Sequence, residues 1–377
     1  MTALIVFNVL VLFALINLAL FAEQKIRWRI KGKSHNPLID RYGMKTLQAA
    51  YPGLPEAELR RLLDESWQRS FVFEPFVMFQ EAPFQGRYVN VDTNRFRRVP
   101  NQGPWPPAAE NFNIFVFGGS TMFGYGVADD QTVPARLQEQ LRAAGPPRPI
   151  CVYNLGCAYY YSTQERILFA QLLLRHIKPD VAVFVDGLND SFWELPGFSD
   201  RFALVMQSEE TPGRPLGVLS DLPLIKKAAK LQQSLAKRLG PHPKDRSGAS
   251  PDVPAAELAR QHVERYLGNR TMIQTLADAA QVKALFVWQP VPHYHYDLSR
   301  HPFIKDPASG EVTKLSYEQF AELLKTNPLP ENFVWAAELH TPLTGRAYID
   351  YTHYGPEMSA ALAELVAQNL RRRGFVP

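Results

Sequence analysis

From residue 113 onward, short apolar runs alternate with longer segments whose apolar residues recur at helical spacing. The apolar runs predict four buried strands, at residues 113–117, 150–154, 181–185 and 282–289. The longer segments predict helices at residues 134–144, 162–176, 254–280 and 356–373. Apolar strands that alternate with helices form a parallel sheet covered on both faces. We therefore expect an α/β fold with three layers, α/β/α.

Two insertions interrupt this alternation, at about residues 191–253 and 290–346. Within the first, residues 224–239 place leucine and isoleucine on one face and lysine and arginine around the other. This pattern predicts a basic amphipathic helix, which serves as a membrane-surface element or a lid, or lies solvated on the domain. The second insertion has no periodicity that predicts an element.

A front segment, residues 34–112, precedes the alternating part. Residues 54–70 have helical spacing, an aromatic extended stretch follows, and residues 100–107 form a proline-rich loop. Its own apolar residues are too few for an independent core. We expect an accessory layer packed on a main domain of residues 113–377, and the sequence assigns it no function.

The N-terminal pattern differs from the rest, because residues 2–22 carry no charged side chain. As a helix this run is roughly 30 Å long, which matches the hydrocarbon thickness of a bilayer. No basic residue precedes it and no small-residue cleavage site follows it. The run therefore favours an uncleaved transmembrane anchor over a signal peptide, and its uniform apolarity argues against a buried core helix.

Five basic residues follow the apolar run: Lys25, Arg27, Arg29, Lys31 and Lys33. By the positive-inside rule, this flank and the domain after it would lie in the cytoplasm. The same cluster suits contact with anionic lipid headgroups.

Composition further limits the classes of protein to which this sequence can belong. A chain of 377 residues that is 46% hydrophobic can bury one large domain with insertions. The net charge of +4 is modest and its basic residues are scattered outside the N-terminal cluster, so no nucleic-acid partner is expected. The two cysteines, Cys151 and Cys157, exclude a disulfide scaffold; buried thiols are favoured over a bridge.

The candidate chemistry begins where the strand at residues 113–117 ends. Gly118 and Gly119 turn the chain and place Ser120 at the carboxyl edge of the sheet, where open α/β sheets carry their sites. Ser120 is the candidate nucleophile. The alternative is an ordinary turn with a helix cap. The phosphate loop, the dinucleotide fingerprint and the α/β-hydrolase elbow all fail on spacing.

Three further loops at strand ends supply the other groups that acyl transfer requires. His353 is a base for the serine, and Asp350 is a carboxylate that orients the imidazole. Gly156 offers an unobstructed backbone N–H and Asn189 an amide donor, which with the Ser120 N–H would form a three-donor oxyanion hole. Each loop alone can be explained by an ordinary structural role, as a cap, a turn or a surface histidine. Only the occurrence of all of them together favours catalysis.

These strand-end motifs resemble those of the SGNH/GDSL hydrolase family, in the family's order: Gly119-Ser120, Gly156, Gly187-Leu188-Asn189-Asp190 and Asp350-Tyr351-Thr352-His353. The resemblance covers about residues 113–375. It implies a flavodoxin-like α/β/α sandwich with esterase, lipase, deacetylase or O-acetyltransferase activity. It also implies Ser120 as nucleophile, Gly156 and Asn189 as oxyanion donors, and Asp350 with His353 as the rest of a triad.

One motif departs from the family, whose Gly-Asp-Ser-Leu reads Gly118-Gly119-Ser120-Thr121 here. The change removes a side chain that braces the loop and none of the reacting groups. With its N-terminal anchor, the chain resembles bacterial membrane-anchored members that act on envelope or exopolysaccharide acyl groups. This resemblance places the catalytic domain in the periplasm, against the charge bias.

Aromatic and amide side chains near these loops are candidates for a substrate pocket or for core packing: Tyr159, Phe192, Trp193, Trp288 and Gln289. Four residues of the second insertion are candidate metal ligands: His293, His295, Asp297 and His301. No second ligand pair has convincing spacing, so we expect neither a metal nor an organic cofactor.

We therefore expect a membrane-anchored serine esterase that cleaves an O-acyl ester, most plausibly O-acetyl, of a carbohydrate or lipid. One alternative is an O-acyltransferase that uses the same triad and a polysaccharide hydroxyl as acceptor. Another is a catalytically idle, membrane-tethered binding or assembly subunit.

Overall fold

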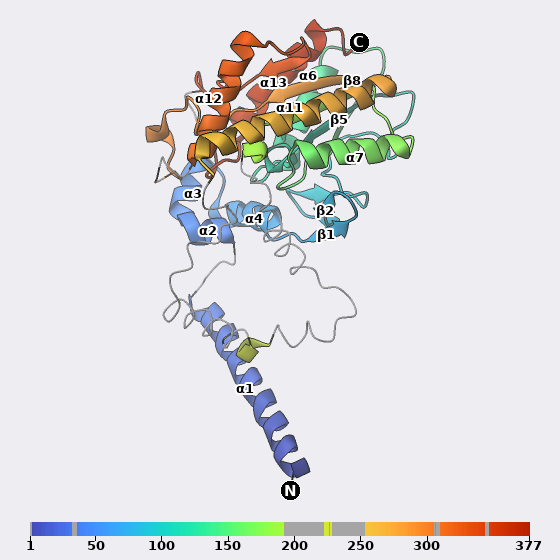
Figure 1. Cartoon of the computed structure of the whole chain (residues 1–377). Coiled ribbons are helices and arrows are strands. Elements are labelled where there is room, and N and C mark those ends of the chain that lie inside the picture. Colours follow the sequence, from blue (N-terminus) through green and yellow to red (C-terminus); the bar gives the residue numbers. More distant parts are fainter. Residues whose placement is uncertain are drawn as a thin grey trace. The chain divides into compact units, whose positions relative to one another are not determined.

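The structure is a computed structural model that describes residues 2–31, 36–191, 222–225, 227, 253–304, 306, 310–343 and 347–377 (Figure 1). It divides into two compact units. One contains the N-terminal helix, and the other contains the front segment together with the α/β domain. The second unit carries every candidate catalytic residue.

A five-stranded parallel sheet forms the centre of this second unit. Its strands are β5 (Phe112–Gly118), β6 (Ile150–Asn154), β7 (Val181–Asp186), β8 (Lys283–Trp288) and β9 (Phe333–Trp335). They lie in the order β6-β5-β7-β8-β9, with every neighbouring pair parallel. Numbered along the chain, this is the 2-1-3-4-5 order of flavodoxin-like folds. The predicted fold class is confirmed.

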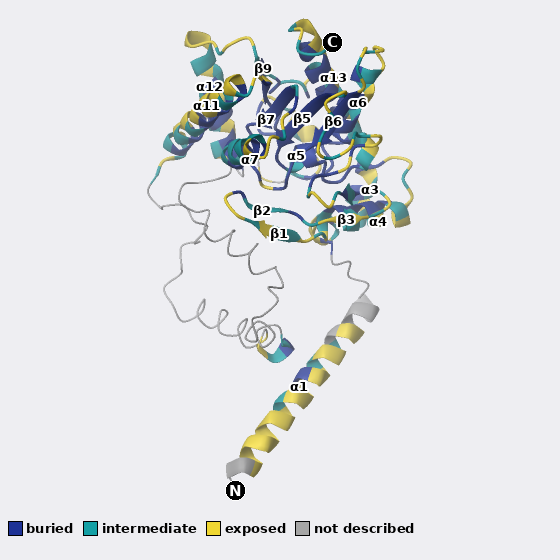
Figure 2. Cartoon of the chain, turned by 90° about the vertical axis from the view of Figure 1, so that its right-hand side faces the viewer, coloured by how far each residue is buried: buried dark blue, intermediate teal, exposed yellow. Residues whose placement is uncertain are grey.

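Alternate residues of each strand face opposite helical layers. Ile114 and Val116 of β5 pack in one core with α6 (Val133–Arg142) and α13 (Pro356–Arg372). Phe115 and Phe117 pack in the other core with α7 (Ser162–Leu174) and α11 (Ala255–Ala279). Figure 2 shows the strands buried between these layers. Because both faces are covered, the strands are apolar throughout.

The second insertion contains two elements that the sequence pattern did not predict. One is α12 (Glu311–Thr326), which packs on α11, and the other is the fifth strand, β9. The buried face of α12 includes Thr313 and Ser316 beside Tyr317 and Phe320. Three short 3₁₀ turns complete the described part of the domain: η1 (Asp129–Gln131), η2 (Asn189–Ser191) and η3 (Leu298–Arg300).

The start of α7 differs from its sequence pattern. Ser162 and Glu165 have the spacing of a capping box, but Ser162 is already inside the helix, after the cap residue Tyr161. The Ser162 hydroxyl instead donates to Asp190 at 2.5 Å, and Glu165 is buried. A tertiary contact with the loop after β7 has replaced the local cap.

The front segment forms three helices and two small antiparallel pairs. The helices are α2 (Pro37–Tyr42), α3 (Met44–Ala50) and α4 (Glu56–Trp67). The strand pairs are β1 (Phe71–Glu74) with β2 (Met78–Glu81) and β3 (Phe84–Gln85) with β4 (Asn90–Val91). Leu59 and Leu63 of α4 share a core with Phe123, Tyr125 and Ile349, which flank the candidate catalytic residues. This core is continuous with the loops of the site.

The N-terminal helix α1 (Thr2–Lys31) contains the one span among the described residues that is long and apolar enough to cross a membrane, Leu4–Glu23. Its large apolar side chains are exposed in the structure, such as Leu4 at 64% and Leu10 at 62% (Figure 2). An N-terminal signal sequence has the same composition. Of the predicted basic helix at residues 224–239, only residues 224, 225 and 227 are among those described.

Both cysteines are buried free thiols, which agrees with the preferred sequence interpretation. Burial also raises the pKa of the Cys157 thiol well above its usual value, so the thiol is neutral.

Three carboxyl groups lie buried under the carboxyl edge of the sheet: Glu165, Asp186 and Asp190. Burial raises the pKa of each, and mutual repulsion raises those of Glu165 and Asp186 further. A carboxyl whose pKa is higher in the folded chain than in the unfolded chain stabilises the fold least at high pH. The stability linked to these groups is present below the ordinary carboxyl pKa and is lost as pH rises.

We predict that Glu165→Gln becomes increasingly more stable than the wild type as pH rises from 5 to 8, because the amide has no proton to lose. The limiting slope is about 1.4 kcal/mol per pH unit for one proton. Urea unfolding at several pH values measures it. Glu139→Gln is the control, since Glu139 is an exposed residue of α6. A difference in unfolding free energy between Glu165→Gln and the wild type that does not change with pH would contradict the raised pKa of Glu165.

Candidate active site

Ser120 is held at the start of a single helical turn. Strand β5 ends at Gly118, Gly119 is the cap residue, and α5 (Ser120–Phe123) begins with the serine itself. A Cβ on residue 119 would lie 2.3 Å from the Asn189 amide nitrogen, so only glycine lets these two loops approach. As the first residue of a helix, Ser120 has an N–H without an intrahelical acceptor.

A continuous hydrogen-bonded chain links the three predicted triad residues. The His353 Nε2 lies 2.9 Å from the Ser120 Oγ, and the His353 Nδ1 lies 2.6 Å from the Asp350 Oδ2. The other Asp350 oxygen accepts the backbone N–H groups of Thr352 and His353, each at 2.8 Å. This short turn fixes the carboxylate against the ring that it orients.

Asp350 is buried, with a relative exposure of 3%. Burial by itself raises the pKa of this carboxyl, but the charge of His353 and the hydrogen bonds from His353 and Thr352 outweigh it. The pKa of Asp350 therefore lies below its ordinary value. The stability contributed by the carboxylate is present above the ordinary pKa and is lost as pH falls through the lowered one.

Asn189 lies beside the nucleophile turn. Its Nδ2 donates to the Tyr160 carbonyl at 2.6 Å, and the same nitrogen is the atom that a Cβ on Gly119 would strike. An amide nitrogen carries two N–H donors, so the second can serve an oxyanion. The next residue, Asp190, accepts the Ser162 hydroxyl and thereby ties this loop to the start of α7.

Gly156 departs from the prediction of an unobstructed donor. Its N–H donates to the Asn154 Oδ1 at 3.0 Å, while the Nδ2 of Asn154 is bound to the Met122 carbonyl at 2.9 Å. A Cβ on residue 156 would lie 2.4 Å from the Phe123 backbone nitrogen. The glycine therefore lets the loop pack against α5, and its N–H is already engaged.

Trp288 is not a pocket residue. It is wholly buried, and its ring lies 4.7 Å from those of Tyr266 and Phe320, centroid to centroid. The alternation along β8 places Trp288 on the same face as Phe286, toward the helical layer of α11. The residue is part of the core on that side.

Gln289 is not a pocket residue either, since it is only 2% exposed. Its Oε1 accepts the Thr121 hydroxyl at 2.7 Å and lies 3.0 Å from the Tyr354 hydroxyl. Thr121 follows Ser120 and Tyr354 follows His353. The Gln289 side chain therefore connects the nucleophile turn to the loop that carries the base.

The remaining pocket candidates are less informative. Tyr159 is 46% exposed, next to the ring of Phe71, and adopts a positive φ of 64° in the loop after Gly156. Phe192 and Trp193 lie outside the described residues.

The front segment supplies a side chain that the sequence did not connect to the site. Trp67 of α4 packs edge-on against the His353 ring, with centroids 5.7 Å apart and an interplanar angle of 84°. Tyr125 stacks on the same imidazole at 5.5 Å and 24°, and Trp67 also contacts Tyr125. The base is thus held between two aromatic rings.

A buried ion pair contacts the Tyr125 ring and its hydroxyl. Arg69 and Glu81 are each 1% exposed and bond at 3.1 Å. Glu81 also accepts the Tyr125 hydroxyl at 3.1 Å and the Ala158 N–H at 3.4 Å, so it contacts both the nucleophile turn and the loop after β6. The Arg69 guanidinium lies over the Phe123 ring, 4.4 Å from its centroid.

The histidines of the second insertion, which were candidate metal ligands, have separate contacts. His293 pairs with the Tyr351 hydroxyl at 2.9 Å, and His295 lies at the surface near Glu338. His301 is buried, and burial lowers its pKa to about 4. Asp297 bonds locally to Ser299. Within the described ranges, no three His, Cys, Asp or Glu side chains are arranged to hold a metal ion.

Comparison with known proteins finds likeness in structure only. No family model and no curated protein matches the sequence. Solved structures that it resembles include a lipolytic protein of the G-D-S-L family from Desulfitobacterium hafniense, at 13% identity and TM-score 0.38 over 69% of this chain and 100% of that one. A lipase from a goat rumen metagenome resembles it at 10% identity and TM-score 0.40, over 71% and 99%.

A Pseudoalteromonas esterase is similar at 11% identity and TM-score 0.37, over 70% of this chain and 98% of that one. The fold assignment itself rests on the strand order, and any functional assignment rests on the site's own geometry.

We predict that Gln289→Met lowers kcat for p-nitrophenyl acetate about ten-fold or more, because the turns that carry Ser120 and His353 lose their shared acceptor. The buried Thr121 hydroxyl also loses its partner, which costs about 1–3 kcal/mol of stability. Gln138→Met is the matched control, because Gln138 is a buried glutamine that binds Pro100 and Val152 away from the site. Equal kcat losses in both variants would refute a positioning role.

Proposed function

We propose that this protein is a serine esterase of the SGNH/GDSL type, with Ser120 as nucleophile, His353 as base and Asp350 as orienting carboxylate. The unbroken hydrogen-bonded chain from Oγ through the imidazole to a buried carboxylate carries the proposal. This is the arrangement that activates serine at neutral pH.

The proposed reaction has two steps. The Ser120 Oγ attacks the ester carbonyl while its proton passes to the His353 Nε2, and the charge on the carbonyl oxygen is met by the Ser120 N–H and the Asn189 amide. The imidazolium then gives the proton to the departing alcohol, and an acyl-serine remains. Water then attacks the acyl-serine while its proton passes to the same nitrogen. The imidazolium returns this proton to the Ser120 Oγ as the acid leaves, which restores the free serine. The neighbouring carboxylate of Asp350 stabilises the imidazolium in both steps.

We predict that a fluorophosphonate probe labels the wild-type chain and that Ser120→Ala abolishes the labelling. His353→Gln should slow labelling by at least 100-fold, because the base contributes about 10²–10⁴-fold. Ser316→Ala, which changes a buried serine of α12, is the control and should label normally. Labelling of Ser120→Ala at the wild-type rate would reject Ser120 as nucleophile and favour the idle binding subunit.

For the substrate we propose O-acyl esters, chiefly O-acetyl esters, of a carbohydrate or lipid. The family resemblance of the motifs supports this class. The proposed setting is a membrane, since α1 has the length and apolarity of a single-pass anchor and the basic segment at residues 224–239 suits a lipid surface. Because bulky esters of the cell envelope are found in the periplasm, the catalytic domain is proposed to lie on that side of the membrane.

O-Acyltransfer to a sugar hydroxyl is the alternative, because the same acyl-serine forms in the first step. We predict that acetate release from p-nitrophenyl acetate matches p-nitrophenol release, with or without an oligosaccharide acceptor. Mass spectrometry of the acceptor provides the measurement. Acetylated oligosaccharide formed at the expense of free acetate would show that the protein is a transferase.

A further inference from the structure

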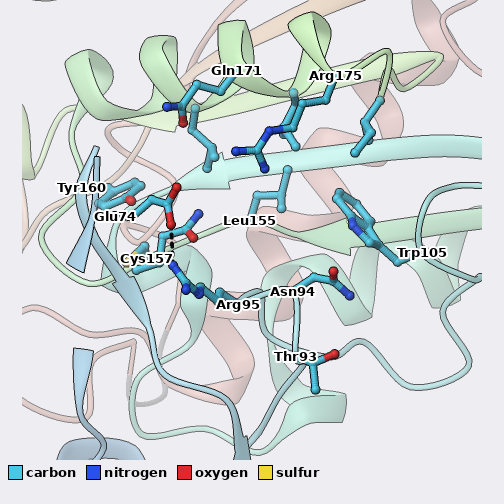
Figure 3. Close-up of a pocket in the computed structure, with 14 residues that line it drawn as sticks. Glu74, Thr93, Asn94, Arg95, Trp105, Leu155, Cys157, Tyr160, Gln171 and Arg175 are labelled. Carbon is cyan, nitrogen blue, oxygen red and sulfur yellow. Dashed lines mark hydrogen bonds and ion pairs between the residues drawn. The ribbon is translucent and has the colours of Figure 1, made fainter. Parts of the chain in front are cut away.

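A polar pocket lies between the front segment and α7, separate from the triad. Its volume is about 280 Å³. Figure 3 shows its polar walls and the floor that they surround. Its charged, amide and indole side chains include Glu74, Gln80, Arg95, Trp105, Gln171 and Arg175. None belongs to the proposed catalytic set.

The pocket has an excess of positive charge. Arg95 forms an ion pair with Glu74, and both side chains remain partly exposed, at 33% and 21%. Arg175 follows the end of α7 and is exposed, and its guanidinium forms no hydrogen bond or ion pair with any residue in the described part of the chain. One guanidinium is therefore uncompensated. Guanidinium groups are suited to bind carboxylate or phosphate through two parallel hydrogen bonds.

Arg95 is held in place at a conformational cost. Its φ of 69° lies in the left-handed region, which non-glycine residues seldom adopt. Such strain persists where the surrounding structure fixes it, and it concentrates at ligand sites. In this protein the strained residue is Arg95 itself, whose guanidinium bonds to Glu74 at the pocket (Figure 3).

The floor and rim of the pocket differ in polarity. Leu155, Leu168 and Leu172 form an apolar floor beside the half-buried Trp105. Gln80 and Gln171 add planar amides to the guanidinium groups at the rim. A sugar ring has an apolar C–H face that packs on such a floor and hydroxyl groups that bond to planar amides. The volume is near the lower end of small-molecule sites, roughly 300–1,000 Å³, and suits one ring.

The pocket also touches the loop that orients the proposed oxyanion donor. Leu155, Cys157 and Tyr160 of the loop after β6 line it, and the Tyr160 carbonyl accepts the Asn189 amide. A ligand in the pocket would therefore lie against the same loop that positions Asn189.

We propose that this pocket binds an anionic sugar unit, with a carboxylate on Arg175 and the ring over the leucine floor. Its assignment as a subsite for the acylated glycan rests on the proposed esterase function, whereas ligand binding as such does not. The proposal narrows the substrate class to a glycan that carries acid groups.

The test is calorimetric titration of the full-length Ser120→Ala chain in detergent, with trigalacturonate, neutral maltotriose and inorganic phosphate as probes. We expect trigalacturonate to bind more tightly than the other two probes. Arg175→Gln should weaken its binding by at least ten-fold, and Gln80→Leu should weaken both sugars. Arg260→Gln, which changes an exposed arginine of α11 outside the pocket, should leave binding unchanged.

The proposal is overturned if trigalacturonate does not bind saturably, if Arg175→Gln has no effect, or if phosphate binds as tightly as trigalacturonate, which would mean a simple anion site. Failure of the esterase proposal is separate, because it appears as absent p-nitrophenyl acetate hydrolysis in the chain with Ser120 intact.

Discussion

The structure depends on holding a four-residue helix in place. Helix α5 is too short to be stable by its own hydrogen bonds, yet it presents the Ser120 hydroxyl and the Ser120 N–H. Arg97, a fully buried residue of the front segment, donates to the carbonyls of Phe123 and Gly124 at its end and to that of Val127 beyond it. Its Nε pairs with Asp129 at 2.9 Å. A cation at this position also interacts favourably with the negative end of a helix.

This dependence changes the interpretation of residues 34–112. A layer that merely covered the sheet would need only apolar contacts, but this one sends buried charges into the site. Arg97 fixes α5, and Glu81 joins Tyr125 to the loop of Ala158. Breaking one member of a buried ion pair costs about 3–5 kcal/mol, so the fold retains such groups only where both partners are bound. The front segment is therefore best understood as part of the site, although its sequence shows no catalytic motif.

The sequence predicted what is local and could not predict what depends on tertiary contacts. Apolar runs defined β5 to β8 closely, because a strand covered on both faces needs no partner to be recognised. The strand β9 has only Val334 fully buried, so it left no pattern. The engaged N–H of Gly156 depends on how Asn154 turns, which spacing does not reveal. The burial of Trp288 could have been predicted. It lies two residues after Phe286 on the same strand and therefore faces the same side of the sheet, toward α11.

Helix α7 connects the loop that carries Asn189 to the polar pocket. Its first residue, Ser162, is bound by Asp190, the neighbour of Asn189, and its last turns carry Gln171 and Arg175 into the polar pocket. A helix packed on the sheet transmits position rigidly, since its backbone hydrogen bonds and the buried Phe169 leave it little freedom. The separation between a sugar at Arg175 and an oxyanion at Asn189 would therefore be set mainly by α7 and its bond to Asp190. On the proposals of an esterase and of an acidic sugar at Arg175, such an arrangement would select esters by their place along a glycan, because only an acyl group at the matching separation would reach Ser120 while its acidic neighbour is bound.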